Sequence, residues 1–117
     1  MNFLSKFSGT TVVITGHTGF KGSWLSLWLH HLGARVIGIS DSIPTSPSNY
    51  VASNISSFIK DLRIDIRDYE SLDKAINSIK PDYVFHLAAQ SLVRSSFADP
   101  IHTWSVNTLG TIHLLES

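Results

Sequence analysis

The 117-residue sequence contains no cysteine, carries no net charge and has no long apolar run. The absence of cysteine excludes disulfides, thiolate metal sites and cysteine nucleophiles, and it fits a reducing compartment. Lys plus Arg and Asp plus Glu number 9 each, so the charge balance favours neither nucleic acid nor a membrane surface as a partner. We therefore expect a small molecule or another protein as the partner, and the cytoplasm as the location.

Membrane spans, a signal peptide and a metal site are not predicted either. The longest apolar stretches, at 11–14 and 24–29, are far shorter than the ~20 residues that a membrane span needs. The first eight residues have one lysine and no apolar core before a small-residue cleavage site, unlike a signal peptide. The six histidines are dispersed, and His30 and His31 point in two directions on a helix, so we predict no metal site.

Strand patterns alternate with helix patterns along the chain. A β-branched run between Gly9 and Gly16 is typical of a strand buried on both faces of a parallel sheet. Apolar residues at helical spacing follow it, and Gly33 supplies a left-handed stop. The predicted strands are 11–15, 35–39, 62–66 and 83–87, and the predicted helices are 20–32, 69–79 and about 101–117.

This alternation predicts an α/β fold, a Rossmann-type parallel sheet with strand order 3-2-1-4, as an incomplete doubly wound domain. The Ser- and Pro-rich segment 40–57 is predicted to be a long surface loop with a helical turn around 50–55. Asp68 is placed to cap the helix at 69–79, which Pro81 ends. One domain fits in this length, although a complete cofactor sheet with a substrate-binding extension needs roughly two to three times as much.

Three glycines at GxxGxxG spacing, residues 16–22 (GHTGFKG), lead from the first predicted strand into the first predicted helix. Such glycines make the tight turn, let backbone approach a pyrophosphate and permit close helix packing. The positive end of the helix then faces the anion. The alternative is a turn with a merely structural role. We predict that a dinucleotide is bound here by Gly16, Thr18, Gly19, Phe20, Lys21 and Gly22, with Lys21 either leaning its charge towards phosphate or simply solvated.

This spacing resembles that of the extended short-chain dehydrogenase/reductases, the NAD-dependent epimerase/dehydratase family, and differs from the GxGxxG of many dehydrogenases. Two further stretches add to the resemblance: PTSPS at 44–48 and AAQSLVR at 88–94. Together with the stretch at 16–24 they are similar to the CDP-glucose 4,6-dehydratase group of that family, more than to dTDP-glucose dehydratases or UDP-sugar epimerases. The similarity covers nearly the whole chain from about Lys6 onward.

The resemblance implies NAD as the cofactor. Ser40 stands where related enzymes often carry the acid that binds the adenosine ribose, and Asp41 follows it. Asp41 is therefore the predicted ribose ligand, with an ordinary loop aspartate as the alternative. No arginine lies nearby in the sequence to receive the extra phosphate of NADP. Asp65 and Ile66 resemble the adenine-side pair of the family, the alternative being a plain strand end.

The end of the fourth strand and the last helix complete the predicted site. The family's HxAAQ stretch implies that Leu87, Ala88, Ala89 and Gln90 approach the ribose and nicotinamide, although small residues also suit close packing. Its NxxGT stretch implies that Asn107 tethers the last helix beside the site and belongs to the cofactor-binding residues, with an ordinary helix residue as the alternative. His86 lies within the strand and is predicted to be a hydrogen-bonded core histidine.

The resemblance implies a lyase of nucleotide-sugar metabolism, such as O-antigen biosynthesis, that converts CDP-glucose to CDP-4-keto-6-deoxyglucose with recycled NAD, as a homo-oligomer when full-length. The family uses a YxxxK pair, and no tyrosine of this sequence, Tyr50, Tyr69 or Tyr83, has a lysine four residues later. We therefore predict no catalytic residue. We expect residues 1–117 to be the cofactor-binding part, inactive alone, with the catalytic and substrate-binding part absent. The alternatives are a stand-alone NAD-binding regulatory module, an NADP-dependent reductase fragment, or a fragment of a UDP- or dTDP-sugar epimerase or dehydratase.

Overall fold

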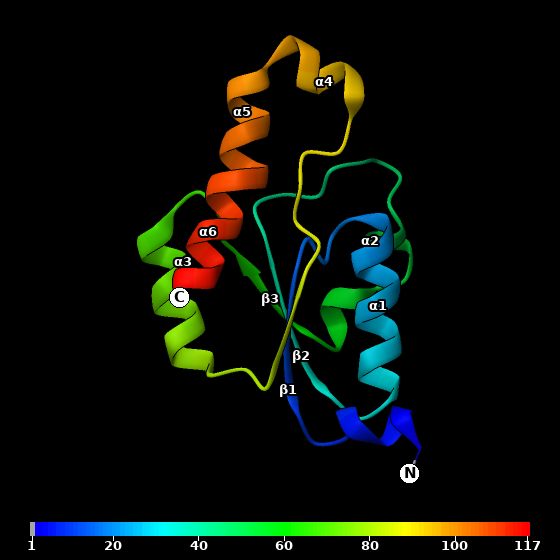
Figure 1. Ribbon diagram of the computed structural model, residues 1–117. Helices are drawn as coiled ribbons and strands as arrows, with labels where there is room; N and C mark the ends of the chain where they lie inside the picture. The colour runs from blue at the N-terminus through cyan, green and yellow to red at the C-terminus, as the bar shows by residue number, and fades with distance from the viewer. Residues whose placement is uncertain (1) are drawn as a thin grey trace.

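Four parallel strands form one sheet, with helices on both of its faces (Figure 1). The structure is a computed structural model that describes residues 2–117. The strand order is β3-β2-β1-β4, which confirms the predicted α/β class and topology. The strands are β1 (Thr11–Thr15), β2 (Arg35–Ser40), β3 (Lys60–Arg63) and β4 (Tyr83–His86).

Two helix layers cover the sheet. In Figure 1, α1 and α2 lie on one side of the strands, and α3 and α6 lie on the other. Helices α4 and α5 project beyond the carboxyl ends of the strands. The helices are α1 (Phe20–His31), α2 (Asn49–Ala52), α3 (Tyr69–Ile79), α4 (Val93–Ala98), α5 (Pro100–Trp104) and α6 (Gly110–Glu116), with short 3-10 helices η1 (Phe3–Phe7) and η2 (Ile55–Ser57) and a π-helix η3 (Ser105–Leu109).

Strand β1 is the centre of the core. Val12, Val13 and Ile14 are fully buried, because β1 is paired on both sides and covered on both faces. Successive strand residues point to opposite faces, so Val12 and Ile14 join the core under α1 and α2 while Val13 joins the core under α3. The continuous apolar run of the first strand therefore has its physical cause in this double burial.

The helix boundaries follow the local signals of the sequence. Asp68 caps α3 by accepting a hydrogen bond from the backbone N–H of Ser71 at 3.2 Å. Gly33 adopts φ +85° just after α1, as a left-handed stop requires. Both confirm the predicted ends. No helix in the described range 2–117 is long and apolar enough to cross a membrane.

Two boundary predictions are wrong. The third strand covers Lys60–Arg63 and not 62–66, because its partner β2 ends at Ser40, which pairs with Arg63. Asp65 and Ile66 therefore lie in the loop that leaves the sheet. The last helical region begins earlier than predicted, with the separate helix α4, and a π turn interrupts the continuous helix expected at 101–117.

Candidate functional site

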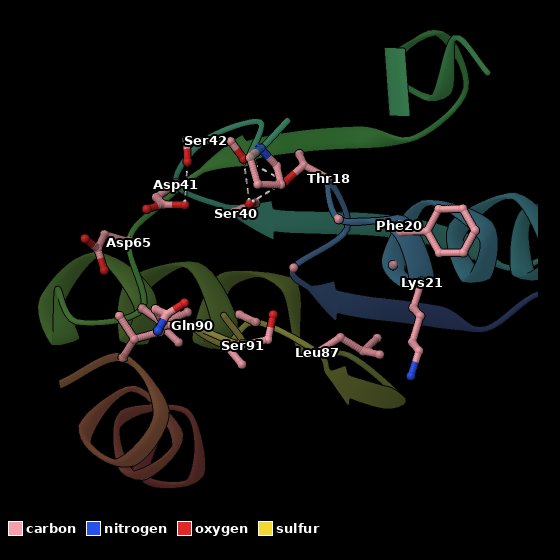
Figure 2. A pocket seen from close by; sticks show the side chains of 18 of the residues that line it. Thr18, Phe20, Lys21, Ser40, Asp41, Ser42, Asp65, Leu87, Gln90 and Ser91 are labelled. Carbon is pink, nitrogen blue, oxygen red and sulfur yellow. Dashed lines mark hydrogen bonds between the residues drawn. The ribbon is translucent and has the colours of Figure 1, made fainter. Parts of the chain in front are cut away.

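A pocket of about 760 Å³ opens at the carboxyl ends of the strands (Figure 2). Strand order reverses here between β1 and β4, and in open α/β sheets ligands bind in the crevice at such a switch point. All the predicted binding residues except Asn107 line it: Gly16, Thr18, Gly19, Phe20, Lys21, Gly22, Asp41, Asp65, Ile66, Leu87, Ala88, Ala89 and Gln90.

The glycine turn between β1 and α1 forms one wall of the pocket. Gly16 has φ +77°, and a Cβ there would lie 2.7 Å from the backbone nitrogen of Ala88. A Cβ on Gly22 would overlap the Gly16 carbonyl oxygen. Gly19 differs, because it has ordinary extended backbone and a Cβ there would meet only the Gly16 oxygen, at 3.4 Å. Gly16 and Gly22 are thus required by the protein's own packing, whereas Gly19 keeps space open at the start of α1.

The end of β2 presents Asp41 to the pocket. Ser40 is buried, and its Oγ lies 2.7 Å from Thr18 Oγ1. The hydroxyls of Thr18 and Ser40 both lie within donating distance of the Ser42 carbonyl oxygen, at 2.7 and 3.1 Å. Asp41 is exposed, and one of its carboxylate oxygens accepts a hydrogen bond from Ser42 Oγ at 3.1 Å. Ser40 is therefore used to close the turn, and the carboxylate at the pocket is that of Asp41.

Asp65, on the third wall, is held by an arginine that sequence reasoning missed. Arg67 donates from Nε and Nη2 to the Asp65 carboxylate, at 3.0 and 2.6 Å, and its backbone N–H donates to the same group at 2.9 Å. These hydrogen bonds hold the pKa of Asp65 below its usual value. The hydrogen bonds with Asp65 raise the pKa of Arg67, and the charges of Asp65 and then of Asp41 add to this effect. No arginine is near Asp41 in the sequence, but the fold brings Arg67 towards it. The guanidinium of Arg67 is already bound by Asp65.

The segment after β4 forms another wall, which begins against the glycine turn at Ala88. Asn107, on η3, accepts a hydrogen bond from the Gln90 N–H at 2.7 Å and donates to the Gln90 carbonyl at 3.0 Å. This is the tether that the NxxGT resemblance implies. Asn107 was also predicted to contact the cofactor, but it does not line the pocket, because both ends of its amide are used on the Gln90 backbone.

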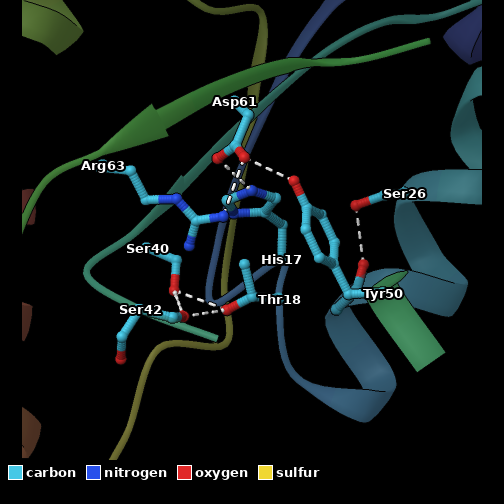
Figure 3. Close-up of polar contacts among 9 residues, drawn as sticks. His17, Thr18, Ser26, Ser40, Ser42, Tyr50, Asp61 and Arg63 are labelled. Atoms are coloured by element: carbon cyan, nitrogen blue, oxygen red, sulfur yellow. Dashed lines mark hydrogen bonds and ion pairs between the residues drawn. The ribbon is translucent and has the colours of Figure 1, made fainter. Parts of the chain in front are cut away.

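A polar cluster behind the glycine turn was also missed (Figure 3). His17 is fully buried, and its Nε2 lies 2.9 Å from the Asp61 carboxylate. Tyr50 donates its hydroxyl to the other Asp61 oxygen at 2.5 Å, and Arg63 donates to it at 2.9 Å. Asp61 lies on β3, 44 residues from His17. The predicted third strand, 62–66, did not include Asp61, so this pair was not predicted. The position of His17 between two glycines of the turn was the sequence signal that could have indicated a buried polar contact.

We expect the free energy of unfolding to fall as the pH drops below about 6.5. Burial lowers the pKa of His17 from its ordinary 6.5, against the opposing effect of Asp61, and burial also lowers the pKa of His86. Below 6.5 the unfolded chain binds protons that the folded chain does not, so stability is complete above this pH and is lost beneath it. The slope for each histidine has an upper limit of about 1.4 kcal/mol per pH unit.

Urea unfolding between pH 8 and pH 5 measures this dependence. The pKa of Asp61 and that of Asp65 are lowered from 3.8, so their contributions are lost only below that value and do not overlap the window. His17→Gln should remove part of the slope, and exposed His31→Gln should leave it intact. A flat profile from pH 7 to pH 5 would contradict the assignment of neutral, buried imidazoles.

The described residues 2–117 contain no group of three or more potential metal ligands of the His, Cys, Asp and Glu types. What the pocket offers is a helix N-terminus beside open space at Gly19, a carboxylate at Asp41 and apolar surface at Ile66 and Leu87. An anion suits the first feature, a sugar hydroxyl suits the second and a flat ring suits the third. The arrangement can therefore hold an elongated ligand that combines phosphate, sugar and ring.

Known proteins carry the same fold and sequence pattern. The CDP-glucose 4,6-dehydratase of Salmonella typhimurium is 50% identical over 111 residues, which cover 95% of this chain and 31% of the relative. The GDP-mannose 4,6-dehydratase of Yersinia enterocolitica is 34% identical over 90% of this chain and 30% of the relative. The chain thus spans about a third of the length of these curated relatives.

Solved structures agree with these sequence matches. The epimerase Mth375 of Methanothermobacter thermautotrophicus superposes with a TM-score of 0.81 at 35% identity, over 97% of this chain and 32% of that one. The UDP-glucose 4-epimerase of Thermus thermophilus in complex with NAD gives 0.79 at 32% identity, over 91% of this chain and 32% of that one. The family model for GDP-mannose 4,6 dehydratase matches residues 13–117. The resemblance read from the glycine turn and the AAQ stretch is confirmed, and the chain belongs to the GDP-mannose 4,6-dehydratase family.

Proposed function

We propose that residues 1–117 are the NAD-binding part of a nucleotide-sugar 4,6-dehydratase whose substrate is CDP-glucose. The observation that carries the proposal is the pocket itself. Residues from the glycine turn, the end of β2, the loop after β3 and the segment after β4 line one cavity at the switch point of the sheet. The GxxGxxG spacing and the AAQ stretch predict the first and the last of these segments, and the family resemblance predicts Asp41, Asp65 and Ile66.

The pocket residues fit a dinucleotide. The pyrophosphate would lie at the start of α1 beside Gly19, where backbone N–H groups and the helix dipole attract an anion. Asp41 would accept hydrogen bonds from the adenosine ribose, and its negative charge would disfavour the 2′-phosphate of NADP. The segment from Leu87 to Gln90 would carry the nicotinamide side. When bound, NAD supplies a reversible hydride acceptor, and the residues of this chain hold and orient it.

CDP-glucose is proposed as the substrate because identity is highest for that activity among the relatives compared. The Salmonella typhimurium CDP-glucose 4,6-dehydratase shares 50% of the aligned residues, whereas the GDP-mannose dehydratases of Yersinia enterocolitica and Vibrio cholerae share 34% and 32%. The YxxxK pair that the family uses is not among these 117 residues. We therefore assign dinucleotide binding to these residues and turnover to a polypeptide that also carries such a pair.

The test uses the natural polypeptide that carries these 117 residues. Calorimetric titration should show tighter binding of NAD than of NADP. Incubation with NAD and CDP-glucose, GDP-mannose or UDP-glucose should give a 4-keto product, detected by its alkaline absorbance, from CDP-glucose alone. NAD binding without any turnover would favour the alternative of an NAD-binding regulatory module. Turnover of GDP-mannose in preference to CDP-glucose would overturn the substrate assignment.

Asp65→Asn tests the proposed adenine contact. The change keeps the shape and replaces one acceptor oxygen by a donor, so an adenine amino group should bind more weakly by roughly 1 to 3 kcal/mol. Nicotinamide mononucleotide has no adenine and should be indifferent to the change. Because Asp65 also engages Arg67, Arg67→Gln is the matched control for disturbance of that pair. Equal losses for NAD and the mononucleotide would show that Asp65 acts only through the loop.

A further inference from the structure

A chain of hydrogen bonds connects the buried end of β1 to α6 through His86. Thr15 Oγ1, fully buried, lies 2.6 Å from His86 Nδ1. On the other side of the ring, His86 Nε2 lies 3.0 Å from Thr111 Oγ1. Thr111 in turn donates its hydroxyl to the Asn107 carbonyl at 2.7 Å. We call Thr15, His86 and Thr111 the relay; none of the three lines the pocket.

The proton positions in the relay follow from the hydroxyl of Thr111. Thr111 directs its own proton at the Asn107 carbonyl, so its oxygen can only accept from His86 Nε2, which places the ring proton on Nε2. A neutral ring carries one proton, so His86 Nδ1 accepts from the Thr15 hydroxyl. Thr15 Oγ1 itself accepts from the Ala88 N–H at 3.2 Å and shares the Leu87 N–H, at 3.1 Å, with the Thr15 carbonyl oxygen at 3.0 Å.

This arrangement requires a neutral imidazole with one tautomer. With the ring proton on Nε2, a second proton on Nδ1 would charge the buried ring and leave the Thr15 hydroxyl proton without its acceptor. Burial favours the neutral ring, because it lowers the pKa of His86. His86 was expected to be a hydrogen-bonded core histidine, and the structure gives it a defined direction of donation as well.

The relay connects elements that form the pocket walls. The backbone N–H of Ala88 donates to Thr15 Oγ1. Ala88 also packs so closely against Gly16 that a Cβ on Gly16 would be 2.7 Å from the Ala88 nitrogen. At the other end of the relay, Thr111 donates to the backbone carbonyl of Asn107. The side-chain amide of Asn107 in turn accepts from the Gln90 N–H. Thr15 thus holds the beginning of the 87–90 segment, and Asn107, which Thr111 contacts, holds its end at Gln90.

The last helix also fastens the wall across the pocket. His113 Nδ1 lies 2.9 Å from the Ile66 carbonyl oxygen, to which it must donate because a carbonyl only accepts. Gly110 permits the close approach, since a Cβ there would lie 2.5 Å from Ile66 Cδ1. The segment from η3 to α6 therefore contacts both the loop after β3 and the segment after β4.

We infer that Thr15, His86 and Thr111 are positioning residues for the dinucleotide, and that they set the place of the 87–90 backbone through a single tautomer of His86. The inference rests on the proposed dinucleotide function, whose site it deepens. Thr15 and His86 act through Ala88, and Thr111 acts through Asn107, so none of them needs to touch the ligand. The effect on binding should appear even though the variants lie behind the wall.

Matched threonine variants in the natural polypeptide provide the test. Thr15→Val keeps the shape but removes the hydroxyl, which leaves the Ala88 N–H and His86 Nδ1 without a partner. It should weaken NAD binding roughly five- to hundredfold, the range expected for the loss of one buried partner. Thr15→Ser keeps the hydroxyl and should restore the affinity. Thr111→Val and Thr111→Ser should behave in the same way at the other end of the relay.

Histidine ¹⁵N spectra recorded without NAD give a second readout. At neutral pH they should show His86 protonated at Nε2 and bare at Nδ1, and Thr15→Val should disturb this pattern. A protonated Nδ1 in the unaltered chain would overturn the relay. A Thr15→Val variant with a lowered melting temperature but unchanged NAD affinity would reduce it to a structural role and also overturn the inference. If the unaltered chain binds no NAD, the dinucleotide function and the positioning role proposed here both fail, and the ¹⁵N pattern then reports only the hydrogen-bond geometry.

Discussion

Gly22→Ala should destabilise the chain by about 3 kcal/mol or more, at the upper end of what overpacking costs. Gly22 lies in the first turn of α1, where alanine is normally the better helix former by about 1 kcal/mol. Here the added Cβ would overlap the carbonyl oxygen of Gly16, a backbone atom that cannot rotate away. That oxygen also accepts the Gly19 N–H at 3.1 Å, so any displacement disturbs the turn.

Urea unfolding followed by tryptophan fluorescence measures this loss. His31→Ala, an exposed change in the last turn of α1, is the control and should alter the free energy of unfolding by less than about 0.5 kcal/mol. The sign of the effect is the critical result. If Gly22→Ala were neutral or stabilising, helix propensity would outweigh the steric overlap with Gly16. The close contact proposed between α1 and the turn would then be wrong.

Sequence reasoning located the pocket because its determinants are local. A buried strand, a glycine turn and a helix follow one another within residues 11–31, and each has its own signal of burial, backbone freedom or spacing. Parallel strands then bring their carboxyl ends to one edge by topology alone. The family resemblance placed Asp41 and Gln90 at that edge, and both line the pocket.

Contacts between distant segments could not be predicted in the same way. His17 meets Asp61 across 44 residues, and the sequence contains nothing that pairs them. Arg67 donates to Asp65, and only the fold brings the charge of Asp41 close enough to add to the effect on the pKa of Arg67. Ser40 lines the pocket, and only the positions of Thr18 and Ser42 show that its hydroxyl is used within the turn.

The misplaced third strand shows how periodicity can mislead. Apolar residues alternate at Leu62, Ile64 and Ile66, which is the pattern of a strand. In the structure Leu62 and Ile64 are partly buried and Ile66 is 5% exposed, all against the core under α3. Hydrogen bonding to β2 stops at Arg63 while this inward alternation continues. The pattern reported burial correctly, but burial does not require a strand partner.

Gly19→Val should leave the fold intact and reduce NAD affinity by about 100-fold, which corresponds to ~2.7 kcal/mol. Gly19 has φ −75° and ψ 172°, a region that β-branched residues adopt readily. A Cβ at this position would make only ordinary contact with the Gly16 oxygen, at 3.4 Å. The rest of the valine side chain would then occupy the pocket at the N-terminus of α1, where the pyrophosphate is proposed to approach the backbone.

Calorimetric titration of NAD into the natural polypeptide, alongside urea unfolding of the same sample, separates the two effects. Gly19→Ala should give an intermediate loss of affinity, because its methyl group fills less of the space. Gly22→Ala should show the reverse pattern, in which stability is lost first and any change in affinity follows from it. Because Gly19 has no packing role that a valine would break, a folded Gly19→Val variant with unchanged NAD affinity would refute the phosphate-binding assignment of the turn.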